Sequence, residues 1–389
     1  MSILINTATL VGATALPITC EVDLLRRLPR MAIVGLPANA VQETAERVRS
    51  ALGDAFPRQR VIVNLSPADI RKTQATMYDL PIAVGIVAAT TGEGISMFDT
   101  SGYLFAAELS LSGDLRPVRG GVALGILARD RDLMLVTDPY TAAEAVTVAG
   151  ARVIAARTLR DVLEHLRGGV QLPPVPDYVD IDRTELDALP PELDAVVQRI
   201  ASAGLPVLLV GPPGCGKSAV ARRVPAAMPA PTEAERIDIA AGLSAAGIMP
   251  RPAMLPARPF RAPHHTVSVQ GLTGDRNGRL GECNLAHYGV LMLDEAAELP
   301  RAQLEAVATA YRTGRTGFPE QGVRAKFLPI YASSPCPCGR YGAEEIIGMP
   351  CGCTSGERAA YLSRVTRYLP EGTVTITLPA ANRAAMASK

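Results

Sequence analysis

One segment of the chain has the residue types and the spacing that bind a phosphate group. Residues 207–218 read Val-Leu-Leu-Val-Gly-Pro-Pro-Gly-Cys-Gly-Lys-Ser and match the phosphate-loop pattern G-x-x-x-x-G-K-[ST] at every fixed position. The glycines let the backbone curl so that its N–H groups surround a phosphate. In such a loop the lysine contacts the β- and γ-phosphates and the serine hydroxyl binds Mg²⁺. The predicted nucleotide-binding residues are Gly211, Pro212, Pro213, Gly214, Cys215, Gly216, Lys217 and Ser218.

A second apolar run ends in two acidic residues. Val290–Leu293 is followed directly by Asp294 and Glu295. An acid at the end of such a strand can hold Mg²⁺, and a carboxylate beside it can orient and activate water. We therefore assign Asp294 to the metal and Glu295 to the water. The alternative is an ordinary strand end with solvated acids, but the preceding phosphate loop favours an NTPase.

The segments around these two motifs predict an α/β module. The four apolar residues before the phosphate loop indicate a buried parallel strand, and a helix-competent stretch follows the loop. The other predicted elements are helices at 191–203, 219–224 and 300–313 and a third strand at 327–332. Prolines between 250 and 263 predict an irregular connection.

The chain before this module predicts a separate mixed α/β domain over residues 1–168. Its expected strands are 32–37, 60–65, 133–136 and 152–155, and its expected helices are 40–52, 79–89 and 159–166. The helix at 40–52 is amphipathic, with Glu43, Glu46, Arg47 and Arg49 on its polar side. A Pro-rich linker is expected at 169–190, followed by the module at 191–389.

Composition limits the function classes. The chain has 389 residues, 48% of them hydrophobic, and a net charge of +1, so any contact with nucleic acid needs a local basic patch. No apolar stretch reaches the ~18 residues that a bilayer span needs. The N-terminus has no positive region before an apolar run, so we expect no signal peptide, no membrane association and a cytoplasmic protein.

Four of the seven cysteines cluster near the end of the module. Cys336 and Cys338 form one C-x-C pair, and Cys351 and Cys353 form a second pair after twelve intervening residues. Four thiolates suit tetrahedral Zn²⁺, although structural sites more commonly use C-x₂₋₄-C. We predict a structural zinc site in this insert, 336–353; four unrelated buried cysteines are the alternative.

These motifs together resemble the ComM/YifB family of magnesium-chelatase-like AAA+ ATPases. The resemblance covers most of the chain and is most specific in two strings, Pro-His-His-Thr at 263–266 and Pro-Cys-Pro-Cys-Gly at 335–339. Further matching strings stand at 34–37, 47–52, 63–69, 78–83, 258–262, 281–282, 285–287 and 361–364.

The resemblance implies a fold, a cofactor set and partners. The first domain would have the fold of the Lon protease catalytic domain, although no Ser–Lys pair for proteolysis is evident. The second would be an AAA+ ATPase that uses ATP and Mg²⁺ and assembles as a ring hexamer. The family binds DNA and is associated with ATP-driven branch migration in recombination and transformation.

The chain departs from the family pattern at several places, one of which is 308–311, where the family pattern is more polar. Ser334 stands where the family has an asparagine that senses the γ-phosphate, and we retain it as a catalytic residue. No clear counterpart of the finger arginine follows Arg364, although Arg364 or Arg367 could substitute. The helical lid is expected to be absent. The alternative function is therefore a weakly hydrolysing or non-hydrolysing regulatory subunit, which would act in a mixed ring with a full-length homologue.

A polar, arginine-containing region lies between the two nucleotide motifs. Its arginines are Arg251, Arg258, Arg261, Arg276 and Arg279. The glycine-rich stretch 271–281 is expected to be a mobile loop or hairpin, either a solvated surface loop or a pore loop that touches the DNA backbone without reading sequence. His264 and His265 are expected to face opposite sides of an extended segment, in a phosphate, interface or structural role.

Overall fold

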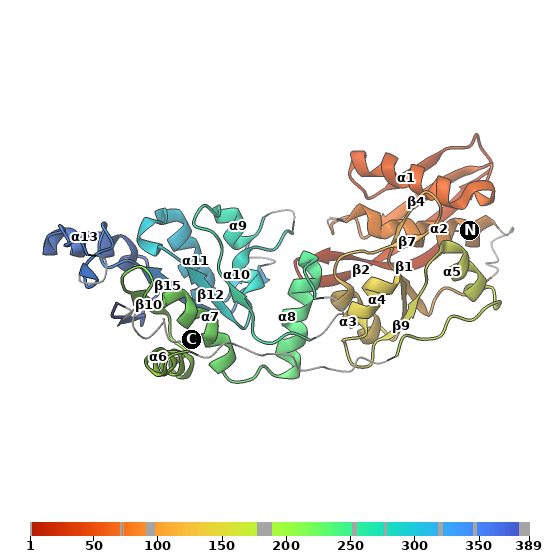
Figure 1. Ribbon diagram of the computed structural model, residues 1–389. Helices are drawn as coiled ribbons and strands as arrows, with labels where there is room; N and C mark the ends of the chain where they lie inside the picture. The colour runs from red at the N-terminus through yellow and green to blue at the C-terminus, as the bar shows by residue number, and fades with distance from the viewer. Residues whose placement is uncertain are drawn as a thin grey trace. The chain divides into compact units, whose positions relative to one another are not determined.

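The computed structural model describes residues 2–70, 72, 74–90, 98–176, 189–250, 255–275, 278–317, 322–344 and 348–380. The chain divides into two compact units (Figure 1), and each is described by itself. The first contains Met1–Ile181 and Ala240–Leu255, and the second contains Asp182–Ile239 and Pro256–Lys389. The expectation of one continuous module over 191–389 did not anticipate that residues 240–255 group with the first unit.

Part of the predicted linker at 169–190 pairs with the first unit. The backbone N–H of Val175 donates to the carbonyl of Val153 at 2.8 Å, and Pro174 forms a bridge with Ile154. This part of the Pro-rich stretch is therefore an extended edge segment. Val175 supplies the N–H donor, so the prolines, which have no N–H, are tolerated there. The rest of the linker, 177–188, lies outside the described residues.

The first sheet of the first unit has the strand order β1-β2-β4-β3. β1 (Ile3–Val11) and β2 (Thr14–Leu25) form an antiparallel hairpin, and β4 (Arg60–Ser66) pairs with β2. β3 (Met31–Val34) runs parallel to β4, and α1 (Ala38–Leu52) connects the two. Side chains alternate along β4, so Val61, Val63 and Leu65 are buried while their neighbours are partly exposed.

A helix that is apolar except at its two ends fills the core of this unit. In α2 (Asp79–Thr90), every residue from Asp79 to Ala88 is buried, as expected for a helix with apolar residues on all sides. A second, parallel sheet contains β5 (Tyr103–Phe105), β8 (Met134–Thr137) and β9 (Arg152–Ala155). The remaining elements are the hairpin β6 (Glu108–Leu109) and β7 (Leu115–Arg116), the short helices η1 (Gly53–Ala55) and η2 (Ala75–Tyr78), and the helices α3 (Gly121–Asp130), α4 (Pro139–Ala145) and α5 (Leu159–Leu166).

A buried ion pair joins α1 to the start of α2. Arg47 Nε donates to Asp79 Oδ2 at 2.6 Å, Arg47 Nη2 donates to Asp79 Oδ1 at 3.1 Å, and the N–H of Leu109 donates to the same carboxylate at 3.2 Å. The sequence predicted that Arg47 lies on the solvated face of its helix. In the structure its side chain instead points toward Asp79. Helical periodicity cannot reveal that a charged residue at the margin of the polar face has an inward partner.

We expect Arg47→Met to lower the free energy of unfolding by about 3 kcal/mol at about pH 8, because it leaves a buried carboxylate without its cation. Burial raises the pKa of Asp79 to about 6, while Arg47 opposes that rise. A carboxyl whose folded pKa exceeds its unfolded value contributes most stability at low pH, and this contribution falls as the pH rises toward the folded pKa. Without Arg47 the pKa of Asp79 rises further, so the loss is expected to be smaller at about pH 5.

Urea unfolding at both pH values measures this difference. The double variant Arg47→Met with Asp79→Asn is the control, since it has no buried charge and its amide oxygen can still accept from Leu109. A destabilisation by Arg47→Met that is equal at the two pH values would contradict the account.

The second unit is built on a five-stranded parallel sheet with the order β11-β12-β15-β10-β16. The strands are β11 (Phe260–Arg261), β12 (Val290–Leu293), β15 (Leu328–Ser333), β10 (Val207–Val210) and β16 (Val374–Thr377). The expected strands at 207–210, 290–293 and 327–332 are all present. Because all five strands are parallel, their carboxyl ends meet at one edge, where open α/β sheets bind ligands.

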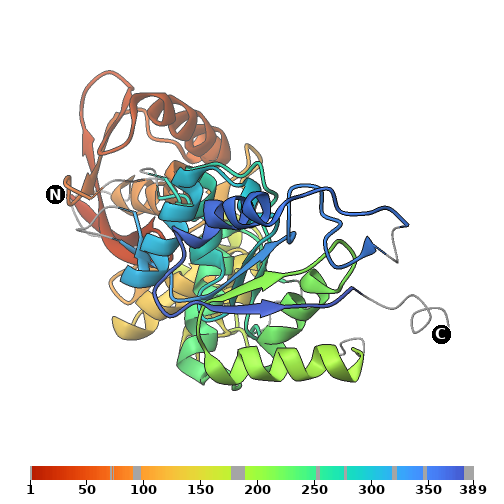
Figure 2. The same cartoon turned by 90° about the vertical axis from the view of Figure 1, so that its left-hand side faces the viewer.

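Helices cover both faces of this sheet. Val207 and Leu209 pack with α6 (Pro191–Ala203) and α7 (Lys217–Ala227), and Figure 2 shows α6, in green, along the lower side of the sheet. The alternate residues, Leu208 and Val210, pack in the core that includes α11 (Arg301–Thr313). The unit also contains α9 (Val269–Thr273), α10 (Glu282–Leu285), η3 (Ala296–Glu298), α13 (Ser355–Thr366) and the hairpin β13 (Arg315–Thr316) and β14 (Val323–Arg324).

One helix, α8 (Glu233–Ala246), contains the second boundary between the units, which falls between Ile239 and Ala240. The end of this helix is held within the first unit, where Ser244 Oγ accepts from the N–H of Val122 at 3.2 Å. No helix in the described parts of the chain is long and apolar enough to cross a bilayer.

Candidate functional site

The predicted phosphate loop lies between β10 and the N-terminus of α7, at the carboxyl edge of the sheet. Gly211 must be a glycine, since a Cβ there would lie 2.6 Å from Cys215 Sγ and 2.9 Å from the carbonyl oxygen of Leu378. Gly216 precedes the helix with φ of +94°, a left-handed conformation that strains other residues. The loop therefore curls tightly, and the first N–H groups of α7 are left free for an anion.

Lys217 is buried inside this loop. Its side chain is 7% exposed, and Nζ donates to the carbonyls of Gly211 at 2.7 Å and Pro212 at 3.2 Å. No carboxylate among the described residues forms an ion pair with it. A buried ammonium group without a counter-ion is costly. A loop that holds a cation in this way is therefore suited to an anionic ligand.

The two acidic residues follow β12 at the same edge of the sheet. Asp294 is exposed and Glu295 is partly buried, and the N–H of Glu295 donates to Asp294 Oδ1 at 3.0 Å. Glu295 has φ of 45° and ψ of 46°, a left-handed conformation that costs an L-residue about 1–2 kcal/mol. Strain of this kind is frequently found at functional sites.

The end of β15 lies between the phosphate loop and Glu295. The N–H of Gly211 donates to the carbonyl of Ser333 at 3.2 Å, and Ser334 Oγ donates to Glu295 Oε2 at 3.4 Å. Three adjacent strands thus bring the phosphate loop, Ser334 and Glu295 to one edge. The exposed Ser218 follows Lys217 at the start of α7, on the same edge.

Sequence reasoning missed a tyrosine beneath this edge. Tyr361 on α13 is 5% exposed, and its burial, together with hydrogen bonding to Glu298, raises the pKa of its phenol. It packs in the same core as Tyr331 of β15. The family string at 361–364 could have drawn attention to it, but nothing in the local sequence shows what the ring packs against.

Arg364, one candidate for the finger arginine, lies on the same helix as Tyr361. Its Nη1 lies 3.6 Å from Glu298 Oε2, and its side chain is 61% exposed. Arg367 is exposed just after the helix. Both arginines are therefore accessible at the surface of this unit.

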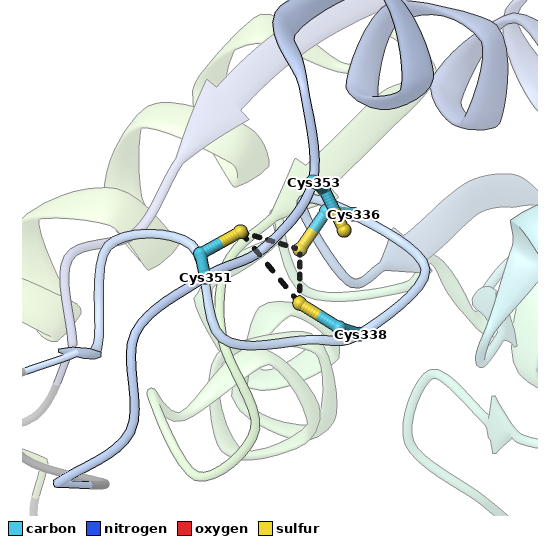
Figure 3. Close-up of side chains that lie close together, drawn as sticks. All are labelled: Cys336, Cys338, Cys351 and Cys353. Atoms are coloured by element: carbon cyan, nitrogen blue, oxygen red, sulfur yellow. Dashed lines mark hydrogen bonds between the residues drawn. The ribbon is translucent and has the colours of Figure 1, made fainter.

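The four cysteines come together (Figure 3). Their sulfur atoms lie within 4.8 Å of one another, with Sγ–Sγ distances of 3.4 Å for Cys336 and Cys338, 3.6 Å for Cys338 and Cys351, and 3.8 Å for Cys336 and Cys351. Four thiolates around tetrahedral zinc, with Zn–S of about 2.3 Å, would stand about 3.8 Å apart. The observed cluster is close to that geometry, and unrelated buried cysteines would not converge in this way.

The four thiols differ in how readily they ionise. The backbone N–H of Arg340 lowers the pKa of Cys338 to about 6, whereas desolvation and hydrogen bonds with neighbouring thiols raise the pKa of Cys351, and the hydrogen bond with Cys338 raises the pKa of Cys353. A bound cation would favour the thiolate form of all four. All four cysteines are free of disulfides. The donor set therefore fits a thiophilic tetrahedral cation such as Zn²⁺.

Two of the described arginines between the two nucleotide motifs, Arg258 and Arg261, are in ion pairs. Arg261 makes a bidentate ion pair with Glu282, at 2.7 and 2.9 Å. Arg258 donates to Glu235 and to the carbonyls of Pro229 and Tyr288. These two side chains therefore link segments within the second unit. Arg279 is exposed. Arg251 and Arg276 lie outside the described residues.

The glycine-rich stretch 271–281 begins as a helix, since α9 continues to Thr273. A tight turn follows, in which the N–H of Asp275 donates to the carbonyl of Arg279 at 3.0 Å. The expectation of a loop over the whole stretch was wrong for its first residues, because Ser268 caps the helix with a bond to the N–H of Gly271. Residues 276 and 277 of this turn lie outside the described residues.

The two histidines do not face opposite sides. The ring centroids of His264 and His265 are 3.9 Å apart, and both side chains are exposed. A turn replaces the expected extended backbone, with the N–H of Val267 donating to the carbonyl of His264 at 2.9 Å. A nearby histidine, His287, is buried, which lowers its pKa to about 4, and its Nδ1 accepts from the N–H of Lys326.

The first unit contains one lysine, Lys72, on which a Ser–Lys pair would depend. Lys72 is buried, and its Nζ donates to the carbonyl of Pro67. Its geometry is that of a structural contact with the preceding loop.

The chain is similar to known proteins along most of its length. The family model for the magnesium chelatase subunit ChlI matches residues 192–383, and a second model for the ChlI subunit of Mg-chelatase matches residues 20–138. YifB of Salmonella typhimurium is 32% identical over 380 residues, which cover 93% of this chain and 73% of that protein. Competence protein ComM of Haemophilus influenzae is 34% identical over 350 residues, which cover 85% of this chain and 68% of that protein.

Proposed function

Because the chain belongs to the ComM/YifB family of magnesium-chelatase-like proteins, we propose that it is an AAA+ ATPase that binds Mg·ATP at the carboxyl edge of its five-stranded sheet. The observation that carries this proposal is Lys217, a buried cation held by the carbonyls of a phosphate loop and lacking a described acidic partner. The triphosphate of a nucleotide supplies the missing negative charge.

Each predicted residue has a role in this proposal. The loop 211–216 holds the phosphates, Lys217 contacts the β- and γ-phosphates, and Ser218 and Asp294 hold the magnesium ion. Mg²⁺ would neutralise charge that develops on the phosphates. Glu295 orients and activates water, and Ser334 fixes the carboxylate of Glu295 through the bond at 3.4 Å.

We extend the proposal to the assembly and the DNA substrate. The chain would form a homo-oligomeric, hexameric ring that contacts DNA without reading its sequence and drives DNA remodelling or branch migration. The relative named competence protein ComM supports a role in transformation. The first unit would be the Lon-like domain of this family. Arg364 or Arg367, both exposed, would serve the nucleotide of a neighbouring subunit.

A nucleotide-holding regulatory subunit is the second candidate. It is favoured by Ser334, which is shorter than an asparagine, and by the ion pair that Arg364 makes within its own subunit. Finger arginines contribute about 10³–10⁵ in turnover in the NTPases that use them, so a chain without one would bind ATP and hydrolyse it slowly. Such a chain would act in a mixed ring with a homologous subunit that supplies the arginine.

ATP turnover by the purified chain, with and without forked DNA, separates the two candidates. A motor is expected to turn over ATP faster with forked DNA, and Glu295→Gln is expected to abolish this activity. ATP binding without turnover in either sample would instead support the regulatory subunit. Absence of ATP binding would reject both.

A further inference from the structure

We infer that a metal ion bound by Cys336, Cys338, Cys351 and Cys353 controls nucleotide affinity by holding the phosphate loop and the end of β15 in place. This inference rests on the proposed ATP site and adds a regulator to it. The ion would be a thiophilic tetrahedral cation such as Zn²⁺, which fits the sulfur spacing described above.

The cysteine segment has almost no hydrophobic core of its own. Between Pro337 and Thr354, among the described residues, only Gly339 and Ala343 are buried. A segment that buries so little apolar surface needs a covalent or metal cross-link to stay ordered. The four thiolates are the cross-link available, and they join the two ends of the segment.

The turn at Gly339 lies beside the phosphate loop. The N–H of Gly339 donates to the carbonyl of Cys336 at 3.0 Å, which closes a tight turn with Gly339 at φ of +72°. A methyl group on Gly339 would lie 3.5 Å from Cγ of Pro213. The turn that presents two of the four cysteines therefore lies beside the loop that would hold the phosphates, with room for about one methyl group between Gly339 and Pro213.

Both ends of the segment lead to the proposed catalytic edge. Cys336 lies two residues after Ser334, whose hydroxyl contacts Glu295. Cys353 directly precedes Thr354, which caps α13 through the N–H of Glu357 at 3.2 Å. α13 in turn carries the buried Tyr361, which packs in the same core as Tyr331 of β15.

A further contact fixes the distal end. Arg358 on α13 donates to the carbonyl of Cys353 at 2.8 Å and stacks over the ring of Tyr341, 4.0 Å from its centroid. The metal would thus join three parts of one edge: the turn against Pro213, the end of β15 and the start of α13. Loss of the ion would free all three, since the chain between the cysteines could then sample many more conformations.

The test uses the full chain and a fluorescent, slowly hydrolysed ATP analogue with Mg²⁺. Zinc-loaded protein, protein stripped anaerobically with a chelator and a reductant, and protein reloaded with zinc are compared for metal content and for analogue affinity. Stripping is expected to weaken affinity about tenfold, within the usual range of coupling between sites, and reloading to restore it.

Two substitutions separate the metal from the thiols. Cys353→Ser is expected to lower both zinc content and nucleotide affinity, and neither should recover on reloading. Cys353→His keeps a good zinc ligand and is expected to retain both. Cys20→Ala, which removes a buried thiol of the first unit, is the control and should change neither.

Linkage supplies an independent readout. If the metal strengthens nucleotide binding, saturating nucleotide must strengthen zinc binding by the same factor, so it should raise zinc affinity about tenfold in a competition with a chromophoric chelator. Hydrogen exchange should rise on stripping in residues 211–216 and 334–354 and stay unchanged in the buried strands.

The outcomes separate this inference from the proposed function. Zinc-loaded protein that fails to bind the analogue would reject the ATP site itself. Stripped protein that binds the analogue with unchanged affinity, or purified protein without zinc, would reject only the metal control. Exchange that rises through the whole second unit would also overturn it, since the ion would then support the fold in general.

Discussion

Lys217→Ala is expected to weaken Mg·ATP binding by about 10- to 150-fold, because charge-assisted hydrogen bonds to a ligand contribute about 1.5–3 kcal/mol. Nζ of Lys217 is buried within the phosphate loop and contacts only the carbonyls of Gly211 and Pro212 among described groups. It is therefore the cation that a triphosphate entering the loop meets. Turnover should fall below detection, since the same charge is needed by the γ-phosphate.

Titration with a fluorescent ATP analogue measures the change in affinity. Lys326→Ala is the matched control, since it removes an exposed lysine of the same unit whose ammonium lies over the ring of Tyr288. It should leave affinity unchanged. Unchanged affinity in Lys217→Ala would sink the proposal that this loop holds the nucleotide.

The parallel strands of the second unit could be predicted from the sequence because their signal is local. β10, β12 and β15 are buried along their whole length, so each appears as an uninterrupted apolar run next to a motif with fixed chemistry. Once the strands are known to be parallel, their carboxyl ends must share an edge. The meeting of the phosphate loop, Ser334 and Glu295 follows from that geometry.

Other features depend on partners that are distant in the sequence. The hairpin of β1 and β2 escaped prediction because the polar residues Thr7 and Thr9 are buried in it, which disrupts the expected alternation. Arg47 looked solvated because its partner, Asp79, stands on another helix. The packing of Gly339 near Pro213 joins two loops, and no local pattern encodes such a contact.

Glu295 offers a test in which stability and activity move in opposite directions. Its φ of 45° is left-handed, so an L-residue is strained there and a glycine is not. Glu295→Gly is expected to raise the free energy of unfolding by about 1 kcal/mol. It should also lose turnover, because the carboxylate that acts on water is removed, and general acid–base groups contribute about 10²–10⁴ in rate.

Glu295→Gln separates the two effects, because it retains the strained backbone and removes only the charge. We expect it to bind Mg·ATP normally, to lose turnover as fully as Glu295→Gly and to unfold like the parent chain. Glu305→Gly is the matched control for the glycine itself: Glu305 lies inside helix α11, where a glycine costs about 1 kcal/mol.

Steady-state turnover and urea unfolding of the four proteins provide the comparison. A destabilised Glu295→Gly would show that the left-handed backbone stores no strain, and turnover in Glu295→Gln would remove the carboxylate from the mechanism. If Glu295→Gly is more stable than the parent chain and has lost turnover, the strained backbone at Glu295 is retained because the reaction with water needs its carboxylate.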